Sequence, residues 1–129
     1  MKQWAGALVL VWWALLSHHD SFAWRSDLTL WADAVERQPT NPRAWINYGT
    51  ALAMAGDWDG GQVAWERAWQ ASLTRDVPTQ RLIEAVSRLN MARKAEHDGD
   101  CQGAQAWMAS LEANFPEWPL SRAFAVCAW

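Results

Sequence analysis

The sequence has 129 residues, the size of one domain with a single core. It is 51% apolar, contains twelve tryptophans and carries a formal net charge of −3. Its charges are mixed in sign and form no basic run, which argues against a nucleic-acid partner, while frequent Ala, Leu, Arg, Glu and Gln favour helix throughout. We therefore expect an all-α fold.

An apolar segment, residues 4–16, follows the positively charged start of the chain. As a helix its thirteen residues would span about 20 Å, less than the ~30 Å of a hydrocarbon core. Ser21-Phe22-Ala23 supplies a small-x-small site for signal-peptide cleavage before Trp24. Three interpretations stay open: a cleaved signal peptide, a retained membrane anchor with tryptophans at the interface, or a helix of the core. In the first two, Lys2 stays on the cytoplasmic side and the remainder is exported.

Helical patterns fill the rest of the chain, separated by short breaks. A first helix over 24–38 would be capped by Ser26 or Asp27, and Asn41 with Pro42 marks the start of the next. We expect further helices over 42–55, 58–72, 79–97, 101–114 and 120–129. Gly56 would end the helix over 42–55, and Gly99 would end the helix over 79–97. Residues 74–78 are expected to form a loop.

Large and small residues alternate on the two helices over 42–72. The first helix carries Trp45, Tyr48, Gly49 and Leu52 on one face, and the second carries Trp58, Gly61, Trp65 and Ala68. This pattern resembles the tetratricopeptide repeat (TPR), whose period is about 34 residues. Weaker copies over 24–39 and 79–116 flank the central one, 42–73.

The resemblance covers 24–129 and implies a right-handed stack of three helical hairpins. Its first hairpin would be incomplete or completed by the N-terminal apolar helix, and 119–129 would cap the open end. The sequence thus divides into an N-terminal anchor or signal segment, 1–23, and a TPR-like domain, 24–129.

Two candidate sites follow, neither of them catalytic. The resemblance places Asn47 and Asn90 in the concave groove, where an amide can meet an extended peptide, with Arg43 and Arg93 one turn away to receive a carboxylate. Export would also favour a disulfide between Cys101 and Cys127, which lie at the same side of a helical hairpin; the alternative is two buried thiols. No motif for a metal, a cofactor or a nucleophile is present.

The expected function is therefore binding, not catalysis. The TPR resemblance implies a scaffold or assembly factor with a protein or peptide partner, on the outer face of a bacterial inner membrane or free in the periplasm after cleavage at Ala23. Residues 4–16 would contact the membrane if retained. One alternative is a structural subunit of a membrane complex. Another is a relative of the TPR tail of membrane glycosyltransferases. The stretch over 25–45 resembles the place where such proteins pass from their last membrane helix into that tail.

Overall fold

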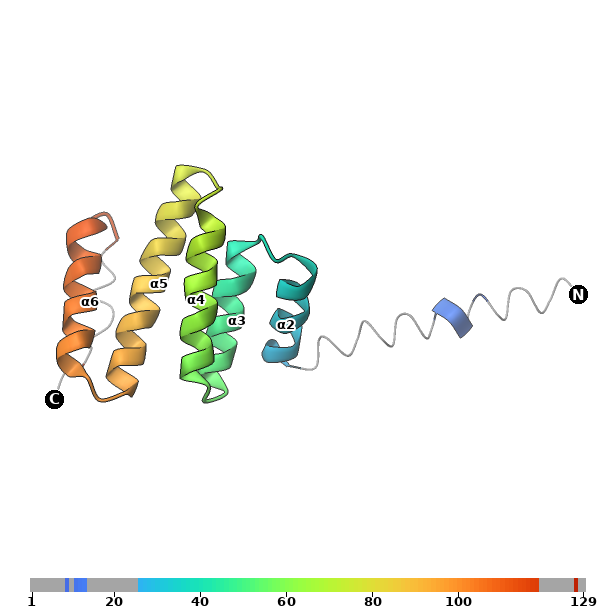
Figure 1. The fold of residues 1–129 in the computed structure, drawn as a ribbon, viewed down its shortest axis with the longest axis horizontal. Helices are drawn as coiled ribbons and strands as arrows, with labels where there is room; N and C mark the ends of the chain where they lie inside the picture. The colour runs from blue at the N-terminus through green and yellow to red at the C-terminus, as the bar shows by residue number, and fades with distance from the viewer. Residues whose placement is uncertain (1–8, 10, 14–25, 119–126, 128–129) are drawn as a thin grey trace, which may run out of the picture.

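The computed structural model describes residues 9, 11–13, 26–118 and 127, and the secondary structure of these residues is helical (Figure 1). The expected all-α class is confirmed. The elements after the N-terminal segment are α2 (Asp27–Arg37), α3 (Pro42–Met54), α4 (Trp58–Ser72), α5 (Val77–His97) and α6 (Cys101–Asn114).

Each of these helices begins at a polar side chain that accepts a hydrogen bond from a backbone N–H of its first turn. The capping residues are Ser26, Asn41, Asp57, Asp76 and Asp100. Such caps pair N–H groups that have no partner within the helix. Glycines end α3 and α5, with Gly56 at φ +96° and Gly99 at φ +79°, a left-handed conformation that side chains disfavour.

The helices follow one another in a row (Figure 1). Each packs on the next from α2 to α6, and α5 also contacts α3. Two core clusters result. One lies mainly between α3 and α4 and consists of Ile46, Ala53, Trp65, Ala68 and Ile83; the other lies between α5 and α6 and consists of Ala85, Leu89, Ala92, Met108, Leu111 and Phe115. Ile83 and Ala85 both belong to α5, so this helix joins the two clusters.

A close backbone approach sets the contact between α3 and α4. A Cβ added at Gly49 would lie 2.5 Å from Trp65 Nε1 and 2.8 Å from the carbonyl oxygen of Gly61. The Trp65 side chain is 1% exposed and fills the space beside these glycines. The small and large residues expected to interlock on these two helices therefore do so.

Several expectations need adjustment at the ends of elements. Helix α5 begins at Val77, so Val77 and Pro78 belong to the helix and not to a loop; a proline fits the first turn, where its missing N–H would have no partner. The expected terminal helix over 120–129 lies outside the described residues apart from Cys127.

The N-terminal segment is described only in part. Val11, Trp12 and Trp13 are helical and 57–72% exposed, so at these residues the segment is not part of a protein core. Among the residues that the structure describes, no helix has the length and apolar character needed to cross a bilayer.

Candidate functional site

The four residues predicted to share a groove lie in different environments. Arg43 is exposed in the first turn of α3, Asn47 is half-buried one turn later, and Arg93 is half-buried near the end of α5. Asn90 is only 5% exposed, so the prediction that it faces an open groove is wrong. Helix α5 packs against α3, α4 and α6, which leaves little of its surface open.

A different hollow lies across α4, α5 and α6, and we call it the tryptophan hollow. It has a volume of about 440 Å³. Its lining comes from Trp65, Glu66, Trp69 and Gln70 on α4, Glu84, Ser87, Arg88 and Met91 on α5, and Trp107 on α6. Trp107 is 39% exposed and Trp69 is half-buried, so aromatic surface from two helices faces solvent around one depression.

The polar groups of the tryptophan hollow are partly engaged with each other. Arg88 pairs with Glu84 at 2.5 Å from Nη2 to Oε1 and also donates to Ser110 of α6. The Glu66 carboxylate accepts a hydrogen bond of 3.0 Å from Gln62. By contrast, the buried Ser87 Oγ has no hydrogen-bond partner within the protein. A buried hydroxyl of this kind costs free energy until it meets a partner.

A second hollow is lined by residues of the α2–α3 and α4–α5 turns, and we call it the arginine hollow. Both turns lie at the upper ends of their helices in Figure 1. Its volume is about 510 Å³. It is lined by Arg37, Gln38, Pro39, Thr40, Asn41, Pro42, Arg43, Arg75, Asp76 and Thr79. Arg75 joins the two turns by donating a hydrogen bond of 2.8 Å from Nη2 to the carbonyl oxygen of Thr40.

Hydrogen bonds shift the pKa values of Asp76 and Lys94, which lie at opposite ends of α5. Asp76 accepts from the Thr79 hydroxyl at 2.7 Å and from the Thr79 N–H at 3.1 Å, which lowers the pKa of its carboxyl. At the other end of the helix, hydrogen bonds with Asp98 and Asp59 raise the pKa of Lys94. The first shift favours the ionised form of a carboxylate at the edge of the arginine hollow.

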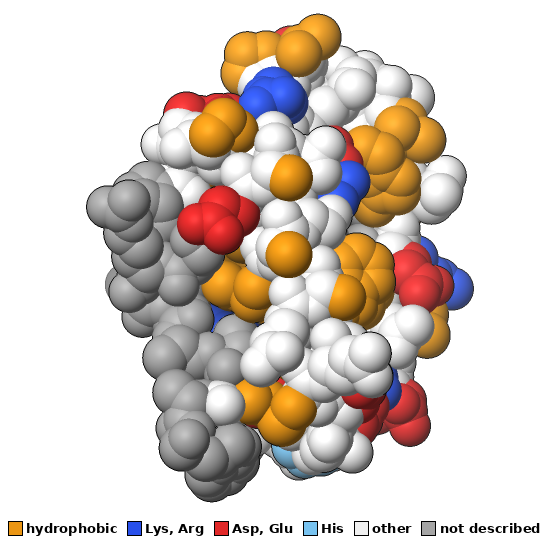
Figure 2. All heavy atoms as spheres, turned by 90° about the vertical axis from the view of Figure 1, so that its left-hand side faces the viewer, with side chains coloured by type: hydrophobic (Ala, Val, Ile, Leu, Met, Phe, Trp, Pro, Cys, Tyr) orange, Lys and Arg blue, Asp and Glu red, His pale blue; other side chains and the backbone are white. Residues whose placement is uncertain are grey.

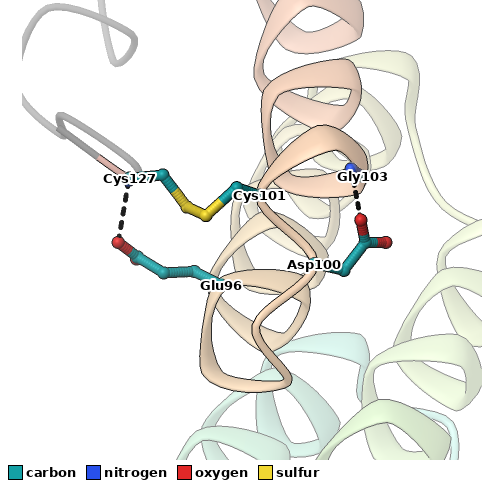
Figure 3. Close-up of a disulfide and its surroundings, with 5 residues drawn as sticks. All are labelled: Glu96, Asp100, Cys101, Gly103 and Cys127. Atoms are coloured by element: carbon teal, nitrogen blue, oxygen red, sulfur yellow. Dashed lines mark hydrogen bonds between the residues drawn. A yellow bond between two sulfur atoms is a disulfide. The ribbon is translucent and has the colours of Figure 1, made fainter. Parts of the chain in front are cut away.

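The two cysteines are joined in a disulfide (Figure 3), with their Cα atoms 5.8 Å apart. Cys101 stands at the first position of α6, next to Asp100, which caps that helix by accepting from the Gly103 N–H at 2.8 Å. A hydrogen bond also holds Cys127, whose backbone N–H donates to Glu96 Oε1 at 3.0 Å. The bond thus attaches residue 127 to the turn between α5 and α6.

Comparison with known proteins finds no counterpart: no protein-family model, curated protein or solved structure matches this chain. The function must therefore be argued from the geometry. Within the described part of the chain, no three His, Cys, Asp or Glu side chains gather as metal ligands would.

Apart from Arg43, sequence reasoning missed the residues that line the two hollows. Trp69, Ser87 and Trp107 come from three helices, whereas Arg37 ends α2 and Arg75 lies in the α4–α5 turn. The one available signal was the number of tryptophans, which exceeds what so small a core requires. That excess indicates exposed aromatic surface but does not say which residues provide it.

Proposed function

We propose that this chain is a non-catalytic, TPR-like interaction module that holds a segment of a partner protein in the tryptophan hollow. The observation that carries the proposal is the exposed aromatic surface of Trp69 and Trp107 around one depression. Tryptophan is over-represented among residues that dominate binding energies, because it removes a large apolar area from water.

The chemistry of the hollow favours an apolar side chain flanked by a basic one. Trp69, Met91 and Trp107 offer the apolar surface, and the exposed carboxylate of Glu66 stands beside them. Figure 2, which faces the α6 end of the row, shows hydrophobic patches separated by acidic and basic side chains. A partner with alternating apolar and basic residues would complement such a surface.

The TPR-like character is supported by the succession of packed helices and by the additional contact between α3 and α5. Such a scaffold places partner segments on the faces of stacked helices. We extend the proposal to a right-handed stack, with the module exported behind residues 1–23 and acting as a scaffold or assembly factor on the outer face of a bacterial inner membrane. The disulfide agrees with an oxidising compartment.

The test is selection from a random library of twelve-residue peptides on the full-length chain. We expect enriched peptides to pair an aromatic or aliphatic residue with Lys or Arg. Their affinity should fall at least tenfold in Trp107→Ala, since truncation of a central aromatic contact typically costs about 2 kcal/mol. Addition of peptide should also shift the indole N–H resonances of Trp69 and Trp107.

Met54→Ala is the matched control, because Met54 is 79% exposed at the end of α3, on a helix that does not line the hollow. Its affinity for the selected peptides should equal that of the wild type. A library that yields no enriched sequence, or peptides that bind Trp107→Ala as tightly as the wild type, would refute the proposal. Recovery of the native protein with companions in fixed ratio would instead favour the alternative, a structural subunit of a membrane complex.

A further inference from the structure

Apolar side chains are exposed at the turn between α4 and α5. Leu73 follows the last residue of α4 and is 48% exposed, and Val77 is the first residue of α5 and is 66% exposed. Pro78, next to Val77, is exposed as well. In Figure 1 this turn reaches beyond the neighbouring α2–α3 turn, so it forms a projection and not a hollow. A group of this kind, unlike scattered single residues, is typical of a surface that binds a protein or a membrane.

Arginines lie beside this projection. Arg75 belongs to the turn itself, and its hydrogen bond to the Thr40 carbonyl holds the turn against the α2–α3 turn. Arg37 and Arg43 line the arginine hollow together with it. A neighbouring hollow of about 370 Å³, which shares two lining residues with the first, adds Arg67 from α4. Basic side chains from three helices and one turn thus gather at the same end of the row.

Acidic side chains balance part of this positive charge. Asp76 lines the arginine hollow, Asp33 pairs with Arg37 at 2.8 Å, and Glu36 is exposed in the last turn of α2. Four arginines therefore stand beside three carboxylates, and so small an excess would hold a soluble anion only weakly. A partner that also covers the apolar projection gains more, because burial of apolar surface adds to the electrostatic attraction.

A bilayer with anionic lipids offers both contacts at once. Its surface presents phosphate oxygens that attract arginine, and its acyl chains lie directly beneath. Trp45 lines the second hollow, half-buried, with its ring 5.0 Å from the Arg67 guanidinium carbon, and tryptophan is enriched at membrane interfaces.

We propose that the end of the row formed by the α2–α3 and α4–α5 turns docks on the surface of an anionic bilayer. Leu73 and Val77 insert below the headgroups, and the four arginines contact lipid phosphates. The inference depends neither on the function proposed for the tryptophan hollow nor on a membrane contact of residues 4–16. Because the arginines are exposed, binding should weaken as ionic strength rises.

A fluorophore at position 77 tests the contact locally, so that binding through another segment is not mistaken for it. The two native cysteines form a disulfide, which leaves one thiol in the full-length variant Val77→Cys for an environment-sensitive NBD label. We expect vesicles with equal amounts of phosphatidylcholine and phosphatidylglycerol to shift its emission to the blue and to raise its intensity at least twofold. Vesicles of phosphatidylcholine alone should require a severalfold higher lipid concentration.

Met54→Cys with the same label is the matched control, because Met54 is 79% exposed at the end of α3, at the opposite end of the row in Figure 1. Its emission should not respond to vesicles. In the Val77→Cys background, Arg43→Gln should raise the lipid concentration at half-maximal response by about fivefold, the typical effect of one basic residue near an anionic surface. Leu73→Ser should also raise it, since less apolar surface would be inserted.

Unchanged emission at position 77, or equal responses at positions 54 and 77, would overturn the proposal. Equal responses to the two kinds of vesicle, or an unchanged response in Arg43→Gln, would do the same, because the arginines would then have no role. Sodium phosphate that releases the labelled protein at a lower ionic strength than sodium chloride would show that the arginines bind the free anion instead. Polyglutamate that produces the same blue shift would indicate an acidic protein partner in place of a bilayer.

Discussion

Gly49 and Trp65 fit together where α3 meets α4. The Trp65 Nε1 lies against Gly49 and has no hydrogen-bond partner in the protein, so the indole is held there by packing alone. An unpaired buried donor is a cost that the surrounding contacts must offset. The fit leaves no room for a side chain at position 49, although alanine has the higher helix propensity.

Gly49→Ala should therefore destabilise the protein by about 1–3 kcal/mol, because the added Cβ would meet both the Trp65 ring and the Gly61 carbonyl. In a Trp65→Leu background the same substitution should cost less, since a leucine can turn away and only the Gly61 carbonyl remains. Urea unfolding of the wild type, the two single variants and the double variant, monitored by far-ultraviolet circular dichroism, gives the coupling energy between positions 49 and 65. Equal costs in the two backgrounds would contradict this account.

At the residue scale, the sequence predicted this interlock but not the surroundings of Asn90. Gly49 and Trp65 stand on neighbouring helices joined by a short turn, so helical spacing alone brings them together. Asn90 is buried because α5 has neighbours on several sides, and one of them, α3, is separated from it by a whole helix. A local pattern carries no information about such a contact.

At the scale of elements, helix ends were more predictable than helix partners. Ser26 and Asn41 were expected at helix starts and act as caps, since a short polar side chain before a helical pattern has few other roles. Arg43 and Arg75 could not be paired from sequence, because their common hollow depends on how the α2–α3 and α4–α5 turns meet. The same holds for Trp69 and Trp107.

The cap of α5 should make its stability depend on pH. The pKa of Asp76 is lowered by its hydrogen bonds with Thr79, so its contribution is present above the unfolded-state pKa and is lost as pH falls through the lower folded-state pKa. Asp76→Asn keeps a capping oxygen without a titrating group. Between pH 7 and pH 3 it should therefore lose less unfolding free energy than the wild type, as measured by urea midpoints.

Asp76→Ala is the companion variant, because it removes the cap at every pH. It should be less stable than Asp76→Asn at both pH values. The lowered pKa values of Asp98 and Glu117, which hydrogen-bond to Lys94 and Arg81, act in the same direction in all of these proteins and so leave the comparison intact. Parallel pH profiles for the wild type and Asp76→Asn would rule out this role for Asp76.

At the scale of the whole molecule, α5 and the disulfide hold the chain together in different ways. Helix α5 contributes to both core clusters, so the hairpins of α3–α4 and α5–α6 should unfold as one cooperative unit. The disulfide instead restrains the unfolded chain, since Cys101 and Cys127 are 26 residues apart.

Loss of this bond should lower the free energy of unfolding by about 3–4 kcal/mol, the chain-entropy value for a loop of this length. We expect dithiothreitol and the double substitution Cys101→Ser with Cys127→Ser to lower the urea midpoint by the same amount, and the double variant to be insensitive to dithiothreitol. The bond attaches residue 127 beside Glu96. A midpoint that dithiothreitol leaves unchanged would show that the bond does not contribute to the stability of the protein.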